Sequence, residues 1–203
     1  VGAVWIYARL PSGEYSQQGS KLVPNDSVGN ARFGHSVSMH SSGLVLAVGG
    51  PHDSNGVGAT WIFTRASLDD AFVQLGSKLV GSGHSGPKSW QGYSVSLSGS
   101  TLAVGGPEDF NGVGATWIFD GSSGAWLQDG NKIVGNYPAS SLHRQGTSVS
   151  LRDKFLVVGG VDSVHTFGPA SAVPAGSHHL FVESPNSPVH GDHGNSHLGS
   201  AVA

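Results

Sequence analysis

Two segments of the chain carry oxygen-bearing side chains at a spacing that could bind calcium. Residues 51–56 read PHDSNG and residues 107–112 read PEDFNG. In each segment an Asp and an Asn stand two positions apart and a Gly follows, namely Asp53 with Asn55 and Asp109 with Asn111. A calcium ion collects about six to eight hard oxygen ligands around a sharp turn. The two segments therefore predict calcium loops.

A metal-free turn explains the same residues. Asn-Gly is the dipeptide most typical of tight hairpin turns, and an Asp or Asn side chain can brace such a turn through its own hydrogen bonds. In each loop, moreover, only one acid and one amide stand at the positions where fuller calcium loops carry three acids. The sequence leaves both interpretations open, with calcium as the cofactor in one and no cofactor in the other.

Histidine is abundant near the end of the chain, where residues 190–197 read HGDHGNSH. His190, His193 and His197 have spacings that could gather a transition metal. The surrounding sequence is rich in Gly and Pro and lacks the pattern of a helix or strand, so nothing would hold the ligands in place. A solvated loop is the simpler prediction.

One site for a covalent modification stands out. Asn25 begins the chain's single Asn-x-Ser/Thr triplet. In a protein secreted by a eukaryote we expect a glycan on Asn25, and otherwise the triplet is an ordinary turn.

Catalytic constellations are not evident. Most acids stand in turn sequences, and we find no Ser/His/Asp order, no glycine-rich phosphate loop after a strand and no recurring pair of carboxylates. The absence of cysteine excludes disulfides and thiol catalysis, and the net charge of −3 argues against a protein that binds nucleic acid by neutralising phosphates. We therefore expect a protein that is not an enzyme.

The elements that position these residues recur along the chain. Trp5, Trp61 and Trp117 follow one another at intervals of 56 residues, and GVGATWIF at 56–63 is repeated at 112–119. A second motif, LAVGGP, occurs at 46–51 and 102–107 and returns as LVVGG at 156–160. Such self-similarity is typical of repeats that share one core.

Each repeat contains four short runs separated by turn residues. The first alternates small and apolar residues, the second is almost wholly apolar, the third carries an aromatic pair and the fourth carries a lysine. Charged residues make up only 11% of the chain, which disfavours amphipathic helices. We predict an all-β fold of β-propeller type with four-stranded antiparallel blades, the second strand near the axis and the fourth at the solvent edge. The residues expected to be structural are Trp5, Trp61, Trp117, Gly49, Gly50, Gly105 and Gly106.

At these residues the chain resembles the FG-GAP repeat family, whose repeats form the propeller heads of integrin α-chains and occur in many secreted or surface proteins. Phe33 and Gly34 match the first element of the family name, and GGP at 49–51 and 105–107 matches the second with Gly for Ala. The fourth copy is degenerate, and His165 replaces its Trp as a packing residue. The resemblance implies a propeller, an extracellular setting and calcium in the loop between the second and third strands.

The chain is expected to form a single propeller segment over residues 1–203. The repeats span about 1–32 in part, 33–90, 91–144, 145–197 and 198–203 in part. This arrangement gives fifteen strands, one fewer than four complete blades need. Either more of the same chain completes the end blade, or another copy does so through residues 1–7 and 199–203, which would build a filament.

The expected function is that of an extracellular or cell-surface structural and adhesion module. Its partners would be other proteins, copies of itself or glycans, with no nucleic acid and no membrane span in this segment. The alternative is a carbohydrate-active propeller, either a glycosidase or lyase or a lectin.

Overall fold

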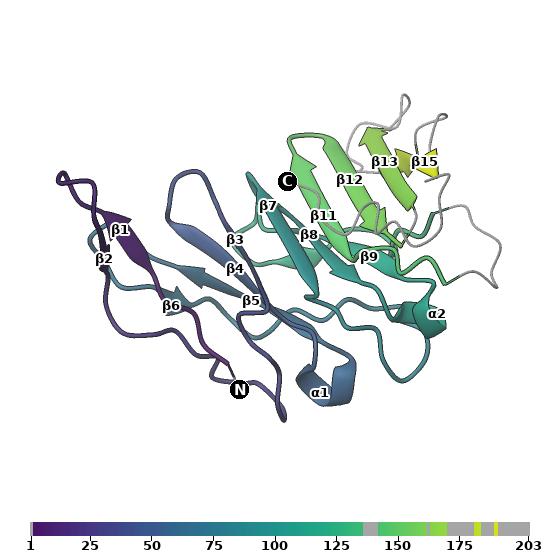
Figure 1. Cartoon of the computed structure of the whole chain (residues 1–203), viewed down its shortest axis with the longest axis horizontal. Coiled ribbons are helices and arrows are strands. Elements are labelled where there is room, and N and C mark those ends of the chain that lie inside the picture. The colour runs from purple at the N-terminus through teal and green to yellow at the C-terminus, as the bar shows by residue number, and fades with distance from the viewer. Residues whose placement is uncertain (1, 136–141, 162, 170–180, 184–188, 191–203) are drawn as a thin grey trace.

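The computed structural model describes residues 2–135, 142–161, 163–169, 181–183 and 189–190. These residues form an all-β structure of antiparallel sheets that stand side by side along the molecule (Figure 1). We name the sheets I to IV in chain order. The four-stranded sheets II and III each correspond to one sequence repeat.

Sheet I contains β1 (Tyr7–Arg9) and β2 (Tyr15–Gln17). Sheet II contains β3 (Ser36–Met39), β4 (Val45–Gly50), β5 (Ala59–Thr64) and β6 (Val73–Gln74). Sheet III contains β7 (Ser94–Ser98), β8 (Thr101–Gly106), β9 (Ala115–Asp120) and β10 (Leu127–Gln128). Sheet IV contains β11 (Ser148–Arg152), β12 (Phe155–Gly160), β13 (Ser163–Pro169), β14 (Phe181–Glu183) and β15 (Val189–His190). Two short helices, α1 (Asp53–Gly56) and α2 (Asp109–Gly112), join the second and third strands of sheets II and III.

The strand register repeats from sheet to sheet. Val48 of β4 pairs with Trp61 of β5, and Val104 of β8 pairs with Trp117 of β9. In sheet IV the same place is taken by His165, which pairs with Val158. His165 is fully buried and stacks on Phe167, with ring centroids 6.2 Å apart. The histidine thus occupies the position that tryptophan holds in the other repeats.

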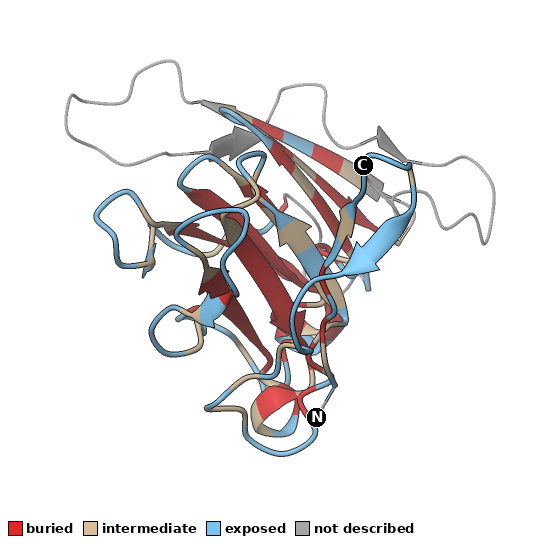
Figure 2. Ribbon diagram, turned by 90° about the vertical axis from the view of Figure 1, so that its left-hand side faces the viewer, coloured by how far each residue is buried: buried red, intermediate tan, exposed pale blue. Residues whose placement is uncertain are grey.

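The sequence predicted that the second strand of each repeat lies near the axis, and this prediction was wrong. The first strands are the ones that lie next to one another, since β7 contacts both β3 and β11. The second strands β4 and β8 lie inside their sheets, between the first and third strands. The second strands are apolar because neighbouring strands flank them and neighbouring sheets cover their faces, which buries almost every residue of β4 and β8 (Figure 2).

Serine side chains of the first strands form hydrogen bonds that connect each sheet to the next. The hydroxyl of Ser36 donates to the carbonyl of Gly92, and that of Ser94 donates to the carbonyl of Gly146, both at 2.8 Å. The hydroxyl of Ser38 in turn accepts the backbone N–H of Leu97 at 3.0 Å. The small polar residues of the first strand therefore connect adjacent sheets.

The paired glycines allow close approach of backbone and ring. A Cβ on Gly49 would lie 2.0 Å from the carbonyl oxygen of Gly92, which no side chain could tolerate. A Cβ on Gly50 would lie 2.7 Å from the ring of Trp61. Gly105 and Gly106 have the equivalent contacts in sheet III. These four positions therefore require glycine for space.

The core lies between the sheets. Trp61 and Phe63 of sheet II pack with Val4 and Ile6 of the first repeat. Trp117 and Phe119 of sheet III pack in the same way with Ile62 of sheet II. Trp61 and Trp117 are completely buried, whereas Trp5 is 50% exposed. The third-strand aromatics thus fill the space towards the preceding sheet.

Candidate functional site

The two predicted calcium loops fold as α1 and α2, which are single helical turns with irregular centres. Ser54 and Asn55 adopt positive φ angles of 50° and 59°, and Phe110 and Asn111 adopt 48° and 56°. Asparagine tolerates this left-handed region better than most residues. The turns bury Asp53 and Asp109 completely and leave Asn55 and Asn111 exposed. The acid and the amide of each pair therefore occupy different environments.

Each buried aspartate is held by a lysine from the end of the same repeat. Lys78 Nζ lies 2.5 Å from Asp53 Oδ2, and Lys132 Nζ lies 2.5 Å from Asp109 Oδ2. The other oxygen of Asp53 accepts the backbone N–H of Val28 at 2.6 Å, and that of Asp109 accepts the N–H of Ser85 at 2.7 Å. Both oxygens of each carboxylate are thus occupied, and an ammonium group supplies the balancing charge.

This geometry does not fit a calcium ion. A metal at Asp53 would have to displace Lys78, whose positive charge stands where the metal's charge would be needed. Within the described part of the chain, no group of three or more His, Cys, Asp or Glu side chains could hold a metal. Calcium at Asp53, Asn55, Asp109 and Asn111 stays a prediction, and a binding measurement must test it.

Asn25 is exposed, as a glycan acceptor must be. Its neighbour Asp26 is a hydrogen-bond centre, because its carboxylate accepts the indole N–H of Trp61 at 2.7 Å and the backbone N–H of Lys78 at 2.8 Å. Burial by itself raises the pKa of Asp26, but these hydrogen bonds and one from Gln74 outweigh it and hold the pKa below 3.8. The predicted modification site therefore adjoins a structural contact.

The histidine-rich segment gives no site that can be described. Residues 191–203, which include His193 and His197, lie outside the described residues, as does the terminal segment expected to complete a blade. The described helices, α1 and α2, have four residues each and are too short to cross a membrane.

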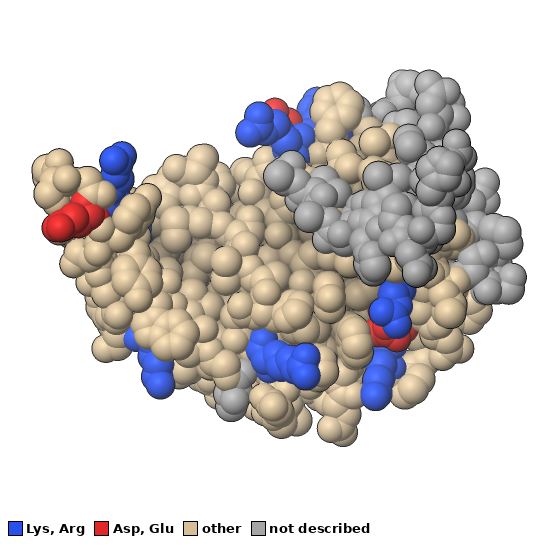
Figure 3. Space-filling view, viewed as in Figure 1, with Lys and Arg blue, Asp and Glu red and all other residues tan. Residues whose placement is uncertain are grey.

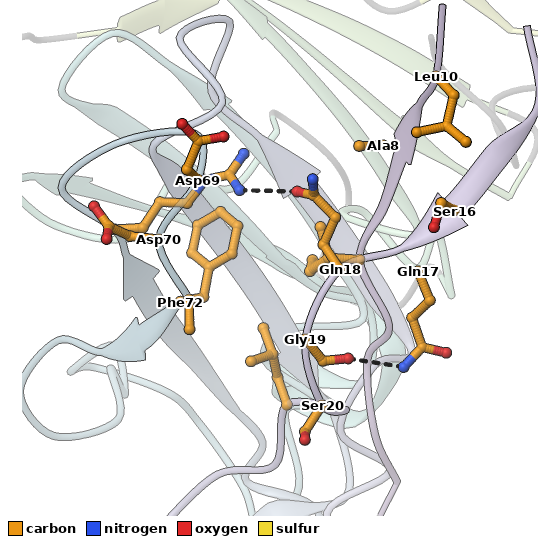
Figure 4. Close-up of a pocket in the computed structure, with 14 residues that line it drawn as sticks. Ala8, Leu10, Ser16, Gln17, Gln18, Gly19, Ser20, Asp69, Asp70 and Phe72 are labelled. Carbon is orange, nitrogen blue, oxygen red and sulfur yellow. Dashed lines mark hydrogen bonds between the residues drawn. The ribbon is translucent and has the colours of Figure 1, made fainter. Parts of the chain in front are cut away.

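A cavity of about 380 Å³ separates sheet I from the outer part of sheet II (Figure 4). Arg65 spans it, with its guanidinium 3.3 Å from the side-chain oxygen of Gln18 and 4.6 Å from the centre of the Phe72 ring. Asp69 and Asp70 lie at its rim and are exposed. None of the residues singled out from the sequence lines this cavity.

A second cavity, of about 260 Å³, lies between sheets III and IV near α2 and was not predicted from the sequence. It is lined by Trp90, Tyr93, Pro107, Glu108, Arg144, Thr147, Gly160 and Val161. The ring centroids of Trp90 and Tyr93 are 6.0 Å apart and the rings are nearly parallel, at 9°. His52 also stacks with Trp90, and their ring centroids are 5.3 Å apart.

The end of the molecule that carries α1 and α2 is rich in positive charge (Figure 3). Arg32, Lys88 and Arg144 are exposed there. Burial and the charge of Arg32 lower the pKa of both His35 and His52 below 6.5. The two imidazoles are therefore neutral at pH 7, and they join Trp90 and Tyr93 as uncharged rings.

Comparison with models of known protein families matches part of the chain. Residues 16–63 match the sequence model of the FG-GAP repeat, a range that runs from β2 through α1 into β5. No curated protein sequence matches the chain. The matched range contains Phe33 and Gly34 and the GGP motif at 49–51, which are the residues that carry the resemblance. Residues 16–63 are therefore similar to an FG-GAP repeat, as their motifs predict.

Proposed function

We propose that the chain is a propeller segment that acts as an extracellular or cell-surface interaction module, for adhesion or for the assembly of a larger structure. FG-GAP repeats occur in integrin-like extracellular adhesion proteins, and this occurrence supports the proposal. The sheets stand side by side as propeller blades do, with their first strands adjacent.

The observation that carries this proposal is an apolar surface beside β1. Val37 and Met39 of β3 are 54% and 45% exposed, whereas their equivalents in β7, Val95 and Leu97, are each 8% exposed. Val95 and Leu97 are covered by sheet II, where Ala47 of β4 and Ile62 of β5 lie against them. Among the residues that the structure describes, sheet I has a counterpart of β5 but none of β4. Val37 and Met39 thus lack the strand that covers their equivalents.

The difference in exposure between Val37 and Met39 and their equivalents in β7 indicates which partner would fit this surface. A strand like β4, paired with the free edge of β1, would cover Val37 and Met39 as sheet II covers Val95 and Leu97. Unpaired strand edges readily accept another strand, since their backbone groups remain available for hydrogen bonding. The proposed partner is the first two strands of an FG-GAP-type repeat, supplied by the same polypeptide or by another copy.

Sedimentation velocity of the 203-residue chain tests the proposal. We expect association that increases with protein concentration, because the apolar surface becomes covered. Replacing Val37 and Met39 by Lys should leave the protein monomeric. The matched control is Val73→Lys, which changes an exposed valine of the outermost strand β6 and should not alter association. Equal association of all three proteins would contradict the proposal.

The alternative function is that of a carbohydrate-active propeller, and the aromatic cavity between sheets III and IV favours it. We propose binding and not catalysis, since Glu108 is the one carboxylate among the described residues that line the cavity, whereas glycoside hydrolysis ordinarily uses a pair. Hydrolysis or elimination of a polysaccharide by the purified chain, lost in Glu108→Gln, would favour the enzyme over the binding module.

A further inference from the structure

The cavity between sheets III and IV combines flat aromatic rings with a balanced set of polar groups. Trp90 and Tyr93 are partly exposed and form one side of it. On the other side Arg144 Nη2 lies 3.1 Å from Glu108 Oε1. The cavity therefore offers an apolar surface, hydrogen-bond donors and a carboxylate acceptor within one small volume.

The fold places these residues at equivalent points of successive repeats. Arg32, Trp90 and Arg144 each stand two residues before a glycine that precedes the first strand of a repeat, and each has a positive φ angle, of 53°, 55° and 49°. The backbone N–H of Trp90 donates to Gly56 at 3.0 Å, and that of Arg144 donates to Gly112 at 2.9 Å. Non-glycine residues held in this region by their surroundings cluster at functional sites. These two turns thus fix Trp90 and Arg144 in the lining of the cavity.

Thr147 adds an acceptor to the polar side. Its hydroxyl donates to the carbonyl of Arg144 at 2.7 Å, which leaves the oxygen lone pairs to accept a hydrogen bond. Arg144 has further N–H groups beyond the one that faces Glu108, and half of its side chain is exposed. A ligand with both hydrogen-bond donors and acceptors could therefore bond to Thr147, Arg144 and Glu108.

We propose that this cavity binds one sugar ring of a glycan, with the apolar face of the ring on Trp90 and Tyr93 and its hydroxyls bonded to Arg144, Glu108 and Thr147. A pyranose has one apolar face and hydroxyls that donate and accept, and the cavity of about 260 Å³ suits a single ring. A nucleotide could also stack on Trp90, but the charged residues of the lining, Glu108 and Arg144, neutralise each other and leave no net positive charge for a phosphate. The observations therefore favour a polyhydroxylated ring without a phosphate group.

This inference deepens the glycan-binding form of the proposed function, and it does not depend on association at β1. It therefore fails or holds separately from the sedimentation result. The monomeric Val37→Lys, Met39→Lys variant serves as the background for the test, so that loss of sugar binding is not confused with loss of association.

The test is saturation-transfer NMR with galactose, mannose, fucose and N-acetylglucosamine as separate probes and adenosine monophosphate as the comparator. We expect transfer to at least one sugar and a chemical-shift change of the Trp90 indole N–H in the titrated protein. Trp90→Ala should weaken that binding by about fivefold, since an aromatic stacking contact contributes roughly 1 kcal/mol. The control is Trp5→Ala, which removes an exposed tryptophan far from the cavity in sequence and outside its lining.

Folding of each variant is verified by its thermal melt. If Trp90→Ala does not fold, Glu108→Gln and Thr147→Val report on the polar side, and each should weaken sugar binding while the melt stays near that of the parent. The proposal is overturned by absence of transfer to every sugar, by transfer to adenosine monophosphate alone, or by sugar binding that leaves the Trp90 indole signal unchanged.

Discussion

Replacing Lys78 by Met would leave the buried carboxylate of Asp53 without its cation. Removing one partner of a buried ion pair costs about 3–5 kcal/mol, because the remaining charge is neither solvated nor paired. The Lys78 side chain is 18% exposed while that of Asp53 is fully buried, so water can reach the vacated position in part. We therefore expect a loss of about 2–4 kcal/mol in the free energy of unfolding. For a protein of this length the loss corresponds to a fall in Tm of roughly 5–12 °C.

The assay is urea and thermal unfolding followed by tryptophan fluorescence and circular dichroism. Lys21 provides the matched control, because it occupies the same position in the first repeat but is exposed. Lys21→Met should change stability by no more than about 0.5 kcal/mol. Adding Asp53→Asn to Lys78→Met should recover part of the loss, since the amide needs no cation.

Two results would refute this reasoning. If Lys78→Met melted within about 1 °C of the unmutated protein, the ion pair would not contribute to stability. If Lys21→Met and Lys78→Met were equally destabilising, the effect would come from the loss of a surface lysine and not from the buried aspartate.

Three further predictions follow from buried contacts. Trp117→Ala should cost about 3–5 kcal/mol, because the side chain is fully buried between sheets II and III, and a near-normal melt would show that this packing is wrong. Asp26→Asn should cost about 1–2 kcal/mol at pH 7 by weakening the hydrogen bonds to its carboxylate. The pKa of Asp26 lies below 3.8 in the folded protein, so this stabilisation is present above pH 3.8 and is lost as the pH falls through the folded pKa; a cost that stays constant down to pH 2 would contradict it. Asp53→Ala together with Asp109→Ala should lower Tm equally in calcium and in EDTA if lysine is the cation, whereas a loss seen only in calcium would establish a metal site.

The sequence predicted the strands of the repeats well, because the same residue pattern occurs in several repeats and each copy supports the strand assignment made for the others. The apolar second run, the aromatic third run and the paired glycines recur at fixed intervals, and they fold as β4, β5 and their counterparts in the same register. The position of the second strand was misjudged because a continuously apolar strand indicates burial on both faces. It does not indicate which strand meets its counterparts in the neighbouring sheets.

The site residues were harder to predict, since their partners are distant in sequence. The sequence offered either a calcium loop or a metal-free turn for Asp53 and a solvent edge for the run that carries Lys78, and neither prediction indicated that Lys78, 25 residues away, would neutralise Asp53. A signal was present, because Lys132 follows Asp109 at nearly the same separation. Trp90 gave no such signal. Its equivalents in the neighbouring repeats are Arg32 and Arg144, so no recurring residue type marked the position.

Binding of a hairpin peptide to the apolar surface beside β1 tests the central claim most directly. Residues 33–51 of this chain contain β3 and β4 and no tryptophan, so the protein's own fluorescence reports binding. The account predicts saturable binding with a blue shift of tryptophan emission, weakened in the Val37→Lys, Met39→Lys protein and retained in Val73→Lys. Absence of binding, or equal binding of a peptide of the same composition in scrambled order, would contradict it.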